Sequence, residues 1–60
     1  MIINEKMMAE TIQEALTETF QEYVRSAITF DEAGMLTQNN GLVVRTINGS
    51  EFQITIVQSK

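Results

Sequence analysis

The chain of 60 residues contains no cysteine, no histidine and no proline. The absence of cysteine and histidine excludes several classes of protein. Without cysteine there is no disulfide framework, and without cysteine and histidine the usual zinc ligands are missing. The common nucleophile and base pairs of catalytic sites cannot be assembled either. We therefore expect no enzymatic activity, no catalytic residues, no metal site and no cofactor.

Basic residues are also scarce, with four against eight acidic residues and a net charge of −4. They are scattered along the chain at Lys6, Arg25, Arg45 and Lys60. Direct binding to nucleic-acid phosphates requires clustered basic side chains, so we expect none. No apolar run approaches the roughly 20 residues that cross a bilayer, and the first residues lack the regions of a signal peptide. We expect a soluble, cytoplasmic protein without membrane contact.

The short length makes independent stability difficult. A domain of this size buries only about 60% of the surface that its unfolded chain exposes. Such domains usually depend on disulfides, a metal or oligomerisation. Because this composition excludes disulfides and the usual zinc ligands, we expect either a homo-oligomer (a dimer or larger) or a protein partner to supply the missing burial.

An amphipathic helix is predicted over residues 5–26. Apolar side chains recur at steps of three and four residues along this part of the chain. They are Met8, Ile12, Leu16, Phe20, Tyr23, Val24, Ala27 and Ile28. Asn4 is a favourable N-cap residue, and Ile3 and Met8 have the spacing of a hydrophobic staple. These signals agree on where the helix begins.

Residues 27–38 fit two structures. The β-branched and aromatic residues at 28–30 favour a strand over 27–30, followed by a turn at Asp31–Gly34 and a strand over 35–38. Alternatively, the helix continues to Ala33 and Gly34 caps its C-terminus. We favour the two strands.

The last third of the chain predicts a β-hairpin with strands 42–47 and 51–57 around Asn48-Gly49. A two-residue turn would place Arg45 opposite Phe52. A three-residue loop over 47–49, with Gly49 in a left-handed bulge, pairs Arg45 with Glu51 instead. We adopt the second register because it separates apolar from polar faces and forms an ion pair across the strands.

These elements predict a single α+β domain over residues 1–60. One long N-terminal helix packs on a small antiparallel sheet of two to four strands. The expected core consists of Met8, Ile12, Leu16, Phe20, Val24, Leu42, Val44, Phe52, Ile54 and Ile56.

Four glutamates at steps of four form one line along the predicted helix. They are Glu10, Glu14, Glu18 and Glu22, and we call them the glutamate row. Like charges at this spacing destabilise a helix by a few tenths of a kcal/mol for each pair. The simple interpretation is a solvated face that keeps the protein soluble. However, no basic residue interrupts the row, and such a line of carboxylates could also bind a basic groove.

Two functional hypotheses follow. The first is a small non-enzymatic protein-binding module that presents the glutamate row to a basic, nucleic-acid-binding protein, as an accessory or inhibitor protein. In its composition, the chain resembles many small phage or bacterial accessory proteins. The alternative is a structural homo-oligomer that assembles through sheet edges and methionine-rich apolar ends.

Overall fold

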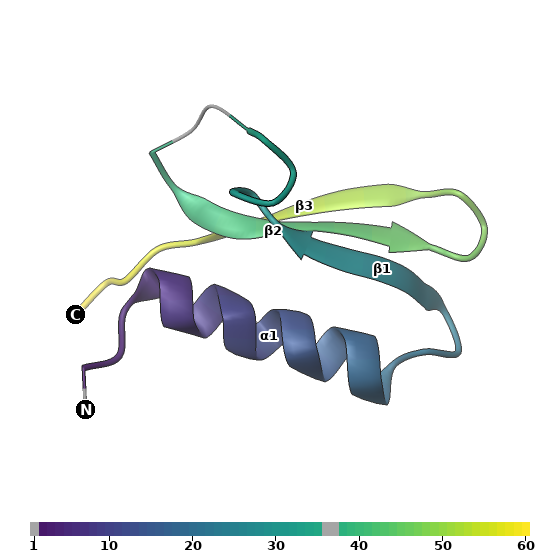
Figure 1. Ribbon diagram of the computed structural model, residues 1–60, viewed down its shortest axis with the longest axis horizontal. Helices are drawn as coiled ribbons and strands as arrows, with labels where there is room; N and C mark the ends of the chain where they lie inside the picture. Colours follow the sequence, from purple (N-terminus) through teal and green to yellow (C-terminus); the bar gives the residue numbers. More distant parts are fainter. Residues whose placement is uncertain (1, 36–37) are drawn as a thin grey trace.

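One helix and three strands follow one another along the chain. They are α1 (Glu5–Thr19), β1 (Val24–Thr29), β2 (Asn40–Thr46) and β3 (Glu51–Ile56). The computed structural model describes residues 2–35 and 38–60. The strands form an antiparallel sheet in the order β1-β2-β3, and α1 lies along one of its faces (Figure 1). The α+β fold class predicted from the sequence is thereby confirmed.

The start of α1 is fixed by two polar side chains. The side-chain oxygen of Asn4 accepts a hydrogen bond from the Met7 amide at 2.9 Å, which confirms the predicted N-cap. Glu5, the first helical residue, accepts a bond from the Gln58 amide at 2.7 Å. The helix start is therefore tied to the segment that follows β3.

The helix ends at Thr19, so the predicted end at residue 26 is wrong. Phe20 leaves the helical conformation, and its carbonyl oxygen accepts a bond from the Val24 amide at 2.9 Å, which closes a turn over residues 21–23. The segment beyond Thr17 is rich in threonine, aromatic and β-branched residues, which have low helix propensity. Val24 gains more by joining the sheet, where it is buried.

The middle of the chain forms one strand and one turn. β1 begins at Val24, earlier than the predicted strand over 27–30. The predicted turn at Asp31–Gly34 is confirmed, with Gly34 at a φ of 72° and its amide bonded to the Asp31 carbonyl. The strand predicted over 35–38 is absent at Met35 and residue 38, and residues 36 and 37 lie outside the described residues.

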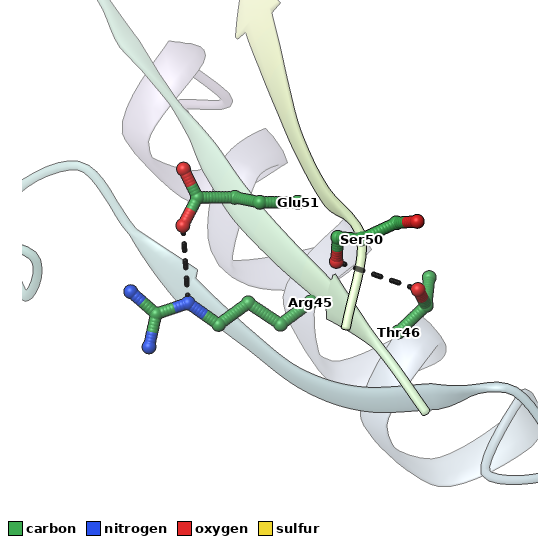
Figure 2. Close-up of polar contacts among 4 residues, drawn as sticks. All are labelled: Arg45, Thr46, Ser50 and Glu51. Carbon is green, nitrogen blue, oxygen red and sulfur yellow. Dashed lines mark hydrogen bonds and ion pairs between the residues drawn. The ribbon is translucent and has the colours of Figure 1, made fainter. Parts of the chain in front are cut away.

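The C-terminal hairpin has the predicted register. Arg45 pairs with Glu51, and Gly49 has a φ of 88° in a three-residue loop. The Thr46 amide donates to the Ser50 carbonyl at 2.9 Å. The Thr46 hydroxyl donates to the same carbonyl at 3.3 Å, and the Arg45 side chain contacts the Glu51 carboxylate at 3.1 Å (Figure 2). The strands cover Asn40–Thr46 and Glu51–Ile56 rather than 42–47 and 51–57.

The core lies between α1 and the two strands β1 and β2. Its buried centre is Val24, Ala27, Leu42 and Val44, against which Ile12 and Leu16 pack. Four residues expected in the core are exposed instead, namely Met8, Phe20, Phe52 and Ile54. Phe52 and Ile54 are exposed because α1 packs mainly on β1 and β2 and touches β3 only slightly. Ile56, also expected in the core, is half-buried.

Phe30 packs closely against Gly41 at the start of β2. Phe30 is buried, and a Cβ atom on Gly41 would lie 2.6 Å from Cε2 of its ring and would also collide with the Ile54 carbonyl oxygen. Only glycine fits at this point, because one of the two obstacles is backbone. Gly41 therefore allows the ring of Phe30 to lie close to β2.

We predict that Gly41→Ala lowers the free energy of unfolding by about 1–3 kcal/mol, as overpacking does. The measurement is urea unfolding followed by circular dichroism. Gly49→Asn is the control, because a Cβ at Gly49 meets no atom and asparagine tolerates a positive φ. Equal stability of Gly41→Ala and the unchanged chain would show that both Phe30 and the backbone at Ile54 move aside freely.

Candidate functional site

The seven glutamate side chains divide into two groups. Glu5, Glu32 and Glu51 each hold parts of the fold together through hydrogen bonds or an ion pair. The side chains of the glutamate row form no hydrogen bond or ion pair within the described residues, and all four residues are exposed. The row therefore has no partner inside this part of the molecule.

Three members of the glutamate row lie together on α1. Glu10, Glu14 and Glu18 line a shallow groove between α1 and the edge of the sheet at β1. Glu22 lies in the turn beyond the helix end, so the prediction of four carboxylates in one helical line is wrong for this residue. The geometry retains a line of three carboxylates, which spans about 12 Å along the helix.

The groove has a mixed lining on its far wall. Arg25, Ser26 and Ala27 of β1 face the carboxylates across it, together with Gln13 and Thr17 of the helix. Arg25 forms no ion pair with the row among the described residues. Exposed carboxylates of this kind accept charge-assisted hydrogen bonds from lysine or arginine of a second protein.

Residues 2–35 and 38–60 contain neither a metal cluster nor a membrane-spanning helix. No three of the acidic side chains there come close enough to hold a metal ion. The helix in that part of the chain is too short and too polar to cross a membrane.

The outer edge of β1 is closed by side chains. The Gln13 side-chain amide donates to the Ala27 carbonyl at 3.0 Å and to the Glu32 carboxylate at 2.8 Å. The same carboxylate accepts bonds from the amide and the hydroxyl of Thr29, at 3.2 and 3.0 Å. We call Gln13 and Glu32 the β1 clasp, because they occupy backbone groups that would otherwise be open to another strand. The bulge between Val24 and Ser26 also disturbs this edge.

Sequence reasoning did not find the β1 clasp. Gln13 and Glu32 are 19 residues apart, and each looks like an ordinary polar residue in its own segment. No local pattern connects a glutamine on a helix to a glutamate in a later turn. Only the packing of α1 against β1 brings the two side chains together.

The opposite edge of the sheet, at β3, is bare. Phe52 is 56% exposed and Ile54 is 39% exposed, and both project toward the helix side of the sheet beside half-buried Ile56. We call these three residues the β3 strip. Ile3 and Met8 line a small hollow with Ile56 at one end of the strip, and Tyr23 lies beside Phe52 at the other. These exposed apolar side chains make the β3 edge a candidate interaction surface.

Comparison of the chain with protein-family models, with curated proteins and with solved structures finds no significant match. Two surfaces of the protein therefore bear on its function, the groove that Glu10, Glu14 and Glu18 line and the β3 strip.

The β1 clasp should make the stability of the fold depend on pH. Hydrogen bonds from Gln13 and then from Thr29 hold the pKa of Glu32 below the ordinary value of 4.5. A carboxyl with a lowered pKa in the folded state stabilises the fold fully above its ordinary pKa. This stabilisation is lost as the pH falls through the lowered value.

We therefore expect NMR titration to give Glu32 a pKa below 4.5 that rises toward this ordinary value in Gln13→Ala. The unfolding free energy of Glu32→Gln should also fall less between pH 5 and acid than that of the unchanged chain. A pKa of Glu32 that is insensitive to Gln13→Ala would show that the β1 clasp does not form in solution.

Proposed function

We propose that this chain is a non-enzymatic protein-binding module that presents Glu10, Glu14 and Glu18 to a basic surface of another protein. Glu22, the fourth member of the glutamate row, lies in the turn after the helix and is also exposed. The observation that supports this proposal is that these side chains are exposed and have no bonding partner among the described residues, whereas Glu5, Glu32 and Glu51 all do.

The spacing of the three carboxylates adds to the argument. Glu10, Glu14 and Glu18 stand at steps of four on one helix, so each neighbouring pair costs a few tenths of a kcal/mol. A helix face that needed only solubility would be more stable with alternating charges. Unscreened carboxylates on a rigid helix attract a basic partner and accelerate its association.

The partner class follows from the charge of the surface. A groove that binds a line of carboxylates needs lysine and arginine side chains at a similar spacing, and such grooves are typical of proteins that bind nucleic-acid phosphates. Occupation of that groove by α1 would compete with nucleic acid. We propose that the protein acts in this way, as an accessory or inhibitor protein.

The test begins with capture of a partner on the immobilised chain from an extract of its source cells, eluted with a salt gradient. We then expect Glu14→Gln/Glu18→Gln to weaken the measured affinity at least tenfold at low salt and to lower its salt dependence. The same variant should be slightly more stable than the unchanged chain, because two like-charge contacts are removed. Thermal unfolding would therefore separate lost binding from lost folding.

The matched control is Gln38→Lys/Ser59→Lys. It changes the net charge from −4 to −2, as the glutamine variant does, but at exposed positions outside α1. This control should keep its affinity within about threefold, since its added charges lie away from the groove. Equal weakening by both variants, or undiminished binding by Glu14→Gln/Glu18→Gln, would contradict the proposal.

A further inference from the structure

The backbone of β3 offers an unoccupied set of hydrogen-bonding groups. Opposite residues in an antiparallel pair alternate between bonded and non-bonded positions. The bond from Thr46 to Ser50 starts this alternation, so the amides and carbonyls of Phe52 and Ile54 face β2. Those of Glu51, Gln53 and Thr55 point away from the sheet.

No side chain in the described part of the chain covers these groups. β3 contains no proline, no lysine and no bulge, the usual devices that protect an edge strand. On β1, by contrast, Gln13 occupies the outward carbonyl of Ala27 and Glu32 occupies the outward amide of Thr29. The sheet therefore has one closed edge and one edge that is ready to accept a further strand.

We propose that β3 pairs antiparallel with β3 of a second copy of this chain across a twofold axis at Ile54. The two sheets then form one continuous six-stranded sheet with both α1 helices on the same face. In this register Gln53 bonds to Thr55 of the second copy, and both residues use their outward-facing groups. Phe52 lies opposite the second copy's Ile56, and Ile54 lies opposite its counterpart, so every pair on the helix side is apolar.

Charge favours a second copy at this edge over one at the helix. Each protomer carries a net charge of −4, so two acidic surfaces in contact would repel. Glu51 is the one charged residue of β3, and Arg45 already pairs with it. In the proposed register the two Glu51 side chains are six residues apart along the strands, or about 20 Å. The interface thus avoids the repulsion that the rest of the surface would produce.

The area also fits a dimer. The exposed fractions of Ile3, Met8, Phe52, Ile54 and Val57 are 55, 43, 56, 39 and 69%. A complete aromatic side chain has roughly 150–250 Å² and an aliphatic one less, so these residues leave on the order of 400 Å² of apolar surface around the edge. A specific interface needs roughly 800 Å² from each partner, and the outward backbone and flanking polar residues of β3 supply the remainder. Because the β1 clasp closes the other edge, assembly stops at two copies.

Cysteine cross-linking tests the register, since the natural chain has no cysteine. We expect Ile54→Cys to form an intermolecular disulfide under mild oxidation, because opposite Cα atoms at such a non-bonded position are about 4.5 Å apart. Phe52→Cys alone and Ile56→Cys alone should not cross-link, since each lies about 14 Å from its own counterpart. A mixture of the two should form the mixed disulfide.

Sedimentation equilibrium over a wide concentration range tests the assembly itself. We expect the unchanged chain to form a dimer and Gln53→Pro to be a monomer with an unchanged circular dichroism spectrum. Proline at residue 53 removes only an outward amide, so β2 keeps its bonds to β3. Phe52→Glu, which places a charge at an exposed position of the interface, should also be monomeric.

A folded monomer at all concentrations, open-ended oligomers, or cross-linking of Phe52→Cys as efficient as that of Ile54→Cys would overturn the dimer. Capture of a different protein that competes with Ile54→Cys cross-linking would assign the edge to that partner and overturn it too. Glu14→Gln/Glu18→Gln should dimerise normally. The test of the β3 dimer is therefore independent of the test of partner binding by the acidic groove.

Discussion

The width of a single helix is the constraint on which the rest of this structure depends. An α-helix with its side chains is about 10–12 Å wide, whereas neighbouring strands lie about 4.8 Å apart. One helix therefore covers about two strands. Here α1 packs mainly on β1 and β2, where Leu42 is fully buried, and it leaves Phe52 and Ile54 of the third strand exposed.

As a consequence, the edge of the sheet at β1 is covered by side chains, whereas no side chain of the described residues covers the edge at β3. The groove between α1 and β1 brings Gln13 within reach of the backbone of β1, and Glu32 completes the closure of that edge. At β3 the helix reaches the strand only near its end, where Glu5 binds the Gln58 amide. The rest of β3 has apolar side chains on one face and free backbone groups along its edge. A monomer would retain both of these unfavourable exposures.

The sequence predicts the parts of this fold that depend on local signals. The N-cap Asn4 and the hairpin register around Gly49 are each determined by a few adjacent residues, and both are confirmed. The end of the helix, in contrast, is not determined by adjacent residues alone. Residues 20–26 continue the apolar spacing of the helix, but Val24 is more stable in the sheet, which the sequence pattern does not reveal.

The candidate sites show the same distinction. Glu10, Glu14 and Glu18 are recognisable from their spacing, because all three belong to one helix. The exposure of Phe52 is not recognisable, because alternation in β3 shows that one face is apolar but not whether a helix covers it. The β1 clasp depends on the contact between α1 and β1. No pattern in the sequence therefore connects its two residues.

Salt provides a physical link between the two proposals, because it acts on them in opposite directions. A dimer through β3 brings two chains of charge −4 together over an apolar contact, so added salt screens their repulsion and strengthens the pairing. Binding of Glu10, Glu14 and Glu18 to a basic groove depends on attraction between unlike charges, and the same salt weakens it. In the proposed dimer the two acidic grooves would lie beside β1, at the outer edges of the continuous sheet and far from the twofold axis. Each copy could therefore bind its own basic partner, and pairing through β3 would make the acidic protein bivalent.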